Sequence, residues 1–361
     1  MHHEGLPSPR QRRIFVLNTG STSTKVALAD GCGSVLQAET YRHAAEELRS
    51  IGNLWNQLPL RLGIAQRWAT EQTDRCDAVA AVGGLLRPLK GGVYSVNELM
   101  LKDAREGIRG EHASNLGCAI AQSVAKEYDC PAYVVDPVSV DEFQPLAYYS
   151  GHPLIKRKSL SHALNIHAAA RIAAQQLHRG VDDASFVVAH LGGGISIAPV
   201  RNGMIIDVND AASDGPFSPE RTGGLPLQEF ITVAYSENMT ENKLRRMVMG
   251  EGGLVAYLGT NSTEEIERRI GAGDGAAREV YEAMAYQIAK EIGAMATVLE
   301  GRTDAVVLTG GLAHSSLLVD TISRRVKYIA PLIVLPGEDE MRSLALGAAR
   351  VLSGEELAME Y

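Results

Sequence analysis

The sequence has few cysteines and no long apolar run. Its 361 residues include 4 cysteines, with no C-x-x-C pair and no His/Cys metal spacing, so we expect neither a disulfide framework nor a zinc site. No stretch approaches the roughly 18 uninterrupted apolar residues of a membrane span, and residues 1–13 lack the apolar segment of a secretory signal. We therefore expect a cytoplasmic protein with reduced thiols and no membrane partner.

An excess of positive charge is missing as well. The formal net charge is −8, whereas a surface that binds nucleic acid needs a basic excess. We expect no nucleic-acid partner, and any phosphate group that the protein handles must be held locally. The length of 361 residues suits two domains that each bury their own core.

The sequence contains two units of the form strand, glycine-bearing turn, strand. Residues 14–17 are an apolar run that ends in Asn-Thr-Gly-Ser, and a β-prone pattern resumes at residues 25–29. The same order recurs at residues 186–189, where a run of three glycines follows, and at residues 195–200, with a further strand expected over 204–208. This weak internal repeat predicts a duplicated domain.

Helical patterns alternate with the remaining strands. Apolar residues recur at three- and four-residue steps over 276–300, and helices are also expected over 112–128 and 161–178. Strands are expected over 132–135, 304–308 and 331–335. The alternation predicts an α/β fold with largely parallel sheets that helices cover on both faces.

The domain boundary is expected near residue 150, where Ser-Gly-His-Pro breaks the pattern. We expect a disordered N-terminal extension at residues 1–12, a first domain at 13–150 and a second at 151–361. The final helix of the second domain is expected to pack back on the first.

Glycine turns follow three of the apolar strands, at residues 18–23, 192–194 and 310–311. Backbone N–H groups can approach phosphate oxygens closely only where no Cβ intervenes, so these turns are candidate phosphate contacts. The sequence has no Gly-Lys dipeptide and no G-x-G-x-x-G after a strand, which excludes a Walker A loop and disfavours a Rossmann fingerprint.

The run LNTGSTSTK at residues 17–25 resembles the opening signature of the acetate and butyrate kinases. Seven further segments are similar to the butyrate kinases of this acetokinase family: residues 135–137, 161–165, 189–194, 215–224, 256–261, 309–311 and 336–340. The resemblance covers about residues 13–355 and implies duplicated actin-like (ribonuclease H-like) α/β domains with an interdomain cleft. The first domain would bind the carboxylate and the second the nucleotide.

The resemblance also implies the reaction. The family uses ATP and Mg²⁺, so this chain would transfer the γ-phosphoryl group of ATP in line to butyrate or a related short or branched fatty carboxylate, or make ATP from ADP and an acyl phosphate. The family commonly forms dimers or higher oligomers, which implies a homo-oligomer here.

The resemblance assigns roles to individual residues. The catalytic candidates are Arg221, His162, Asp136 and Asn18. The candidates for phosphate and nucleotide binding are Ser21, Ser23, His190, Gly192, Gly193, Gly194, Gly310 and Gly311. His112 and Asn115 match substrate contacts, and Glu338 and Glu340 match a magnesium carboxylate, with Glu340 preferred. An arginine fork suits the equatorial oxygens of the transition state, and a carboxylate nucleophile needs no strong base.

One position departs from the family. Val82 stands where the family has an arginine before Gly-Gly, and the loss of a transition-state contact can cost orders of magnitude in rate. Arg87 is the candidate to compensate. The alternative is a degenerate relative that binds nucleotide or acyl phosphate without turnover. A sugar kinase or phosphatase of the same superfamily would need a catalytic aspartate, for which Asp136 and Asp207 are candidates.

Overall fold

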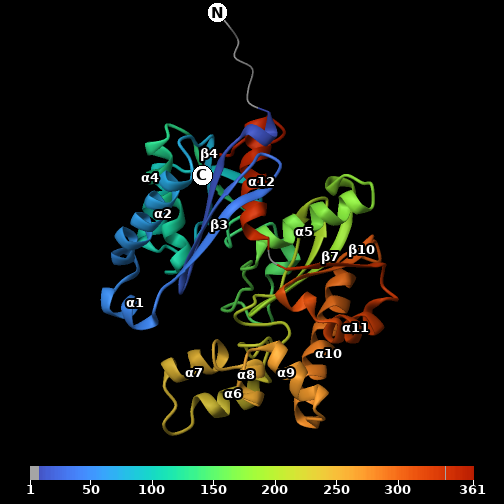
Figure 1. The fold of residues 1–361 in the computed structure, drawn as a ribbon. Coiled ribbons are helices and arrows are strands. Elements are labelled where there is room, and N and C mark those ends of the chain that lie inside the picture. The colour runs from blue at the N-terminus through green and yellow to red at the C-terminus, as the bar shows by residue number, and fades with distance from the viewer. Residues whose placement is uncertain (1–7, 338) are drawn as a thin grey trace, which may run out of the picture. The chain divides into compact units, whose positions relative to one another are not determined.

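The structure is a computed structural model that describes residues 8–337 and 339–361. The chain forms two compact units, which are described separately: Met1–Asp141 with Asp339–Tyr361, and Glu142–Glu338 (Figure 1). The units divide at residue 141 and not near 150, because the Ser-Gly-His segment forms only a small exposed turn inside the second unit, with His152 bridged to Ile155. The final helix, expected in the second domain, is part of the first unit.

The first unit contains a six-stranded mixed sheet in the order β3-β2-β1-β4-β6-β5. Its strands are β1 (Ile14–Gly20), β2 (Ser23–Ala29), β3 (Val35–Arg42), β4 (Ala78–Val82), β5 (Val93–Ser95) and β6 (Ala132–Val135). β1, β2 and β3 pair antiparallel, β1, β4 and β6 pair parallel, and β5 runs antiparallel to β6. The apolar runs at residues 14–17 and 132–135 therefore form strands, as predicted.

Helices cover both faces of this sheet. The helices of the first unit are α1 (Ala45–Ile51), α2 (Leu58–Gln72), α3 (Glu98–Glu106), α4 (Gly117–Glu127) and α12 (Glu340–Ser353). α2 and α4 lie on one face and α12 on the other (Figure 1). Phe15, Trp68 and Ile120 are buried in the core between the sheet and α2 and α4. The pattern at 112–128 is split into a short 3-10 helix, η3 (Ala113–Leu116), and α4.

The segment before β1 differs from its prediction. Residues 1–7 lie outside the described residues, but Pro9–Gln11 form a 3-10 helix, η1, and Arg12 is buried. The carbonyl oxygen of Pro9 accepts a hydrogen bond of 2.8 Å from the amide of Gly31. The disorder expected up to residue 12 is therefore wrong for residues 9–12, because this contact ties them to the turn after β2.

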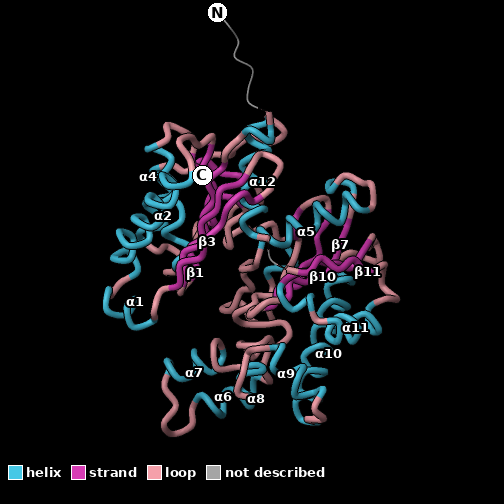
Figure 2. The backbone as a smooth tube through the Cα atoms, viewed as in Figure 1, coloured by secondary structure: helices cyan, strands magenta, loops and turns pink. Residues whose placement is uncertain are grey.

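The second unit repeats the plan with a five-stranded sheet in the order β11-β10-β7-β8-β9 (Figure 2). Its strands are β7 (Ser185–Leu191), β8 (Ile195–Arg201), β9 (Met204–Ile205), β10 (Ala305–Gly310) and β11 (Leu332–Pro336). β7 and β8 form an antiparallel hairpin, and β10 and β11 continue the sheet in parallel from β7. β9 is shorter than the strand expected over 204–208, because only two of its residues pair with β8.

The second unit has seven helices among the described residues. They are α5 (Ala163–Gln176), α6 (Leu227–Ala234), α7 (Glu241–Val248), α8 (Gly253–Leu258), α9 (Thr263–Gly271), α10 (Gly275–Val298) and α11 (Ser316–Val326). The stripe Met284, Ile288 and Ile292 of α10 is fully buried, which confirms the periodic pattern as core. Short 3-10 helices complete the chain at η2 (Leu54–Gln57), η4 (Pro145–Tyr148), η5 (Val181–Asp183) and η6 (Gly311–His314). None of the helices in the described part of the chain combines the length and the apolar character that crossing a membrane requires.

Candidate active site

Three consecutive glycines form the turn between β7 and β8. The Gly192 amide donates to the carbonyl oxygen of Gly194 at 3.2 Å, and the Ser218 hydroxyl donates to that of Gly193 at 2.6 Å. A Cβ on Gly194 would lie 2.5 Å from Nη1 of Arg221, so the guanidinium packs directly on the backbone of the turn. The structure thus brings the predicted arginine and the predicted glycines together.

Two histidines stack close to this turn. His162 precedes α5, His190 lies in β7, and their ring centroids are 4.2 Å apart. Nδ1 of His162 shares a hydrogen bond of 2.9 Å with the hydroxyl of the buried Ser196, which faces His190 across the β7–β8 ladder. Burial of the ring, aided by the charges of His190 and Arg221, holds the pKa of His162 well below its ordinary value. The His162 ring is therefore uncharged at neutral pH.

The end of β10 lies beside the end of β7. Gly310 has a φ of 93°, and a Cβ there would be 2.3 Å from the carbonyl oxygen of Leu191. Gly310 and Gly337 also exchange two backbone hydrogen bonds, of 3.1 and 3.0 Å. Because β7 and β10 are parallel neighbours, the turn at Gly192 and the turn at Gly310 and Gly311 meet at one edge of the sheet.

In the first unit, the β1–β2 hairpin carries the predicted asparagine and serines. Nδ2 of Asn18 donates to Oε2 of Glu340 at 2.5 Å, and Nζ of Lys25 lies 3.5 Å from the same oxygen. Glu340 is the first residue of α12, so this helix brings a carboxylate against the hairpin. Ser21 is exposed in the turn, and Ser23 begins β2.

Asp136 follows directly on β6. It is 2% exposed and has a φ of 39°, a conformation that costs free energy for a residue with a side chain. The Gly92 amide donates to its Oδ1 at 2.7 Å. Val82, the last residue of β4, pairs with Val135 in the ladder, so the position of the missing arginine lies next to the strand end that carries Asp136.

The amide side chain of Asn115 is fully buried and bonded to backbone on all sides. Its Nδ2 donates to the carbonyl oxygens of Ala104 and Gly110 at 3.2 and 3.1 Å. Its Oδ1 accepts from the amide of Leu85 at 2.9 Å. These bonds fix the loop that follows the Gly-Gly at residues 83–84.

The other two expected substrate contacts also have local partners. His112 caps η3, and its Nδ1 shares a hydrogen bond of 2.8 Å with the Ser114 hydroxyl. Arg87 binds Asp103 through Nε at 2.5 Å and Nη2 at 3.0 Å. The Tyr361 hydroxyl donates to the same carboxylate at 2.9 Å. Asp103 therefore holds the guanidinium that was expected to compensate for Val82.

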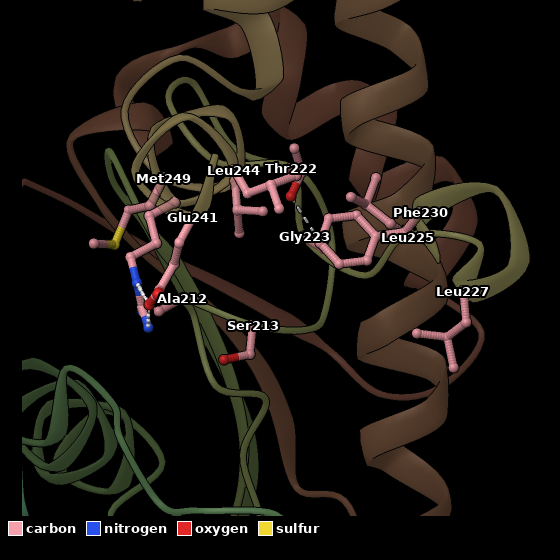
Figure 3. Close-up of a pocket in the computed structure, with 12 residues that line it drawn as sticks. Ala212, Ser213, Thr222, Gly223, Leu225, Leu227, Phe230, Glu241, Leu244 and Met249 are labelled. Atoms are coloured by element: carbon pink, nitrogen blue, oxygen red, sulfur yellow. Dashed lines mark hydrogen bonds and ion pairs between the residues drawn. The ribbon is translucent and has the colours of Figure 1, made fainter. Parts of the chain in front are cut away.

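A cavity of about 540 Å³ lies beside α6 and α7 (Figure 3). Its lining is mostly apolar, with Phe230 and Leu244 among the larger side chains. The charged lining residues Glu241 and Arg245 bind each other, with Nε donating to Oε1 at 2.8 Å. The volume suits a small ligand, but the lining lacks the convergent donors that a phosphate needs. The glycine turns therefore remain the candidate phosphate site.

The sequence of this chain is similar to those of known proteins over nearly its whole length. The sequence profile described as the Acetokinase family matches residues 145–333. Butyrate kinase 2 of Clostridium acetobutylicum is 44% identical over 353 residues, which cover 97% of this chain and 99% of that protein. The chain belongs to the acetokinase family. A probable butyrate kinase of Listeria monocytogenes serotype 4b is 46% identical over 352 residues, or 96% of this chain and 99% of that protein.

Solved structures show the fold of this acetokinase-family chain. The acetate kinase of Porphyromonas gingivalis has a TM-score of 0.76 at 16% identity and covers 96% of this chain and 100% of its own. A propionate kinase of Francisella tularensis has a TM-score of 0.73 at 18% identity, with 93% and 99% covered. The predicted duplicated actin-like α/β fold is confirmed.

Two residues close to the candidate site residues were not predicted from the sequence. Ser196, the partner of His162, is the one hydroxyl in the apolar, buried run of residues 195–200, and such a residue usually has a specific partner. Arg61 is fully buried on α2, four and seven residues before the buried Ala65 and Trp68. An arginine on the apolar face of a helix is unusual, and this position in the sequence indicates a buried guanidinium with specific partners.

Proposed function

We propose that this chain is a carboxylate kinase. It transfers the γ-phosphoryl group of ATP directly to butyrate or a related short or branched fatty carboxylate, and the reaction is reversible. The observation that carries the proposal is the packing of Arg221 on Gly194 beside the stacked His162 and His190, in a chain 44% identical to a butyrate kinase over nearly its full length. This activity belongs to short-chain fatty acid metabolism.

The reaction needs alignment and charge neutralisation more than a base. A carboxylate oxygen attacks the γ-phosphorus, the bond to the bridging oxygen breaks, and ADP leaves with that oxygen. Arg221 neutralises the equatorial oxygens of the transferred group. His162 is uncharged, and in the tautomer in which the Ser196 hydroxyl donates to Nδ1, the ring carries its proton on Nε2, which donates to the phosphoryl group.

The glycine turns hold the nucleotide in this proposal. The N–H groups of Gly192, Gly193 and Gly194 bind the β- and γ-phosphates, beside His190. Gly310 and Gly311 lie at the nucleotide, where a glycine backbone allows close approach. In the first unit, the β1–β2 hairpin binds the transferred phosphoryl group through Asn18, Ser21 and Ser23. Asp136 lies near the same phosphoryl group in this proposal.

Magnesium would be held mainly by the nucleotide. The described residues contain no cluster of three or more ligating side chains, and Mg²⁺ typically takes one or two carboxylates, several waters and the substrate phosphates. Glu340 fits this role, because its carboxylate is partly exposed and its partners among the described residues are the Asn18 amide and a lysine at 3.5 Å. Glu338, the second candidate, lies outside the described residues. The ion would neutralise charge on the phosphates.

The carboxylate substrate is bound in the first unit, with His112 and Asn115 near it. Val82 is the observation that favours a second candidate, a degenerate relative that binds nucleotide or acyl phosphate without turnover. The pairing of Arg87 with Asp103 argues against Arg87 as a replacement for the missing arginine. We favour turnover, because Arg221, His162 and the glycine turns are all present.

The protein acts as a cytoplasmic homodimer or higher homo-oligomer in this proposal. The support is an apolar surface on and around α6, where Leu227 is 73%, Ile231 50% and Tyr235 90% exposed. Neither α6 nor α7 has a buried residue. Apolar patches of this kind usually mark contact surfaces between proteins.

The test is an acyl phosphate assay. Purified protein with ATP and Mg²⁺ is given carboxylates from acetate to valerate and isovalerate, and acyl phosphate is trapped with hydroxylamine, with Val82→Arg run beside the wild type. Turnover that peaks at four or five carbons supports the butyrate kinase assignment and shows that Val82 is tolerated. An inactive wild type that binds ATP, with activity in Val82→Arg, would establish the degenerate alternative.

A further inference from the structure

Arg61 lies beneath the turn of the β1–β2 hairpin and is fully buried. Its Nη1 donates to the carbonyl oxygens of Gly20 at 2.9 Å and Ser23 at 2.7 Å, and its Nη2 donates to that of Ser21 at 3.2 Å. Oε1 of Gln57, one turn earlier on the chain, accepts from Nε and Nη2 at 3.3 and 3.1 Å. A single guanidinium thus fixes three carbonyl groups of one four-residue segment.

This arrangement determines where the amides of the turn point. In a trans peptide unit the C=O and the following N–H point in opposite directions. Because the carbonyls of Gly20 and Ser21 point toward Arg61, the amides of Ser21 and Thr22 point away from it, and both residues are exposed. No backbone carbonyl of the described residues accepts from either amide. Two adjacent N–H groups therefore point away from Arg61, in a turn whose residues Ser21 and Thr22 are exposed, an arrangement that favours an anion.

The charge of Arg61 is not matched by a carboxylate. All acceptors of the guanidinium among the described residues are neutral oxygens, including the Thr24 hydroxyl at 3.3 Å. The next group in the chain of contacts is His43, whose Nε2 is 2.9 Å from that hydroxyl. Burial, aided by the charge of Arg61, lowers the pKa of His43, which favours the neutral imidazole, and a neutral ring supplies no counter-charge to the guanidinium. A buried cation without a counter-ion is unfavourable for folding, and its field acts on the far side of the turn.

We propose that Arg61 is a positioning residue that holds the β1–β2 turn as a binding site for the transferred phosphoryl group and supplies a counter-charge from behind it. The proposal rests on the kinase function proposed above, and it adds a residue that does not touch the substrate. The exposed face of the turn binds the anion. Arg61 determines the backbone conformation of the turn and the electrostatic potential at its exposed face.

The experiment compares Arg61→Gln and Arg61→Lys with Arg67→Gln, which changes an exposed arginine on the same helix. Gln keeps amide donors and removes the charge, whereas Lys keeps the charge and has fewer, less rigid donors. Equilibrium binding of Mg·ATP and of Mg·ADP is measured for each full-length protein, together with kcat and KM in the acyl phosphate assay. Since only ATP carries the γ-phosphoryl group, the ratio of the two Kd values reports on the turn.

In Arg61→Gln we expect the preference for ATP over ADP to fall by about tenfold and kcat by about a hundredfold, with ADP affinity within about twofold of wild type. Arg61→Lys should recover part of both losses, and Arg67→Gln should match the wild type. If Arg61→Gln does not fold, the Arg61→Lys variant tests the proposal, because its preference for ATP over ADP must still be lower than that of the wild type.

Two results would overturn the role of Arg61. One is an unchanged preference for ATP in a folded Arg61 variant, and the other is a wild type that binds ATP and ADP equally well. Failure of the kinase function is a different outcome. A wild type that forms no acyl phosphate from any carboxylate, yet prefers ATP in a manner that depends on Arg61, would leave the positioning role intact.

Discussion

Gly194→Ala separates folding from catalysis at the glycine turn. The new Cβ would lie 2.5 Å from Nη1 and 2.6 Å from Cζ of Arg221, whereas carbon and nitrogen atoms in contact are about 3.5 Å apart. The guanidinium must therefore move by about 1 Å. Because the displaced atoms are the far end of a flexible side chain, we expect the free energy of unfolding to change by less than about 1 kcal/mol.

The same movement of the Arg221 guanidinium should lower kcat strongly. A misplacement of about 1 Å can lower a rate by about a hundredfold, which is about 2.7 kcal/mol in the activation free energy. Gly193→Ala is the matched control, because a Cβ at the neighbouring position would be 3.8 Å from its nearest neighbour, Oε2 of Glu220. That variant also adds a methyl group to the phosphate-binding turn, but it leaves Arg221 in place, so its kcat measures the cost of the methyl group alone.

The assay is acyl phosphate formation with saturating ATP and carboxylate, with urea unfolding measured on the same preparations. The expected result is a kcat for Gly194→Ala about a hundredfold below that of Gly193→Ala, at similar stability. Equal activity of the two variants would refute the argument that the contact between Gly194 and Arg221 positions the arginine. A large loss of stability in Gly194→Ala alone would show that the clash is absorbed by the backbone.

Two further predictions concern stability. Gly310→Ala should lower the free energy of unfolding by about 3 kcal/mol, because φ is 93° and the new Cβ would be 2.3 Å from a backbone oxygen. A Cβ on Gly311 would have nothing within 4 Å, so Gly311→Ala should leave the free energy of unfolding nearly unchanged. Equal urea midpoints for the two variants would contradict this prediction. The depressed pKa of His162 means that the unfolded state binds a proton that the folded state does not, so the free energy of unfolding should fall as the pH drops below about 6.5. His162→Gln should reduce that slope in urea titrations between pH 5 and 8, and an unchanged slope would count against the burial of a neutral ring.

Local patterns predicted the regular elements well. The strand expected over 132–135 is β6 to the residue, and the helix expected over 276–300 is α10, Gly275–Val298. Both have a clear buried face, so the periodicity of the sequence follows the packing. β3 was not predicted, because none of its residues is buried and it therefore shows no alternation.

The candidate site was predicted as a set of residues but not as a set of contacts. Motif similarity named Arg221 and Gly194, yet their contact joins positions that are far apart in sequence and is visible only in the fold. Ser196 and Arg61 carry no motif, and their roles depend on which groups the β-ladder and α2 bring near them. The division lies between Pro137 and Pro145, whereas the prediction followed the denser Gly and Pro break at residues 150–153.

The position of α12 has a consequence for how the protein is made. This helix packs on β1 and β4, but it is synthesised after all of Glu142–Glu338. The second unit is continuous along the chain, so on the ribosome it can reach its native contacts while the sheet of the first unit still lacks one of its covering helices. Glu340 joins Asn18 only at that last step. The carboxylate proposed for magnesium is thus absent until the chain has been synthesised past residue 340, and nascent protein cannot bind the metal there before that point.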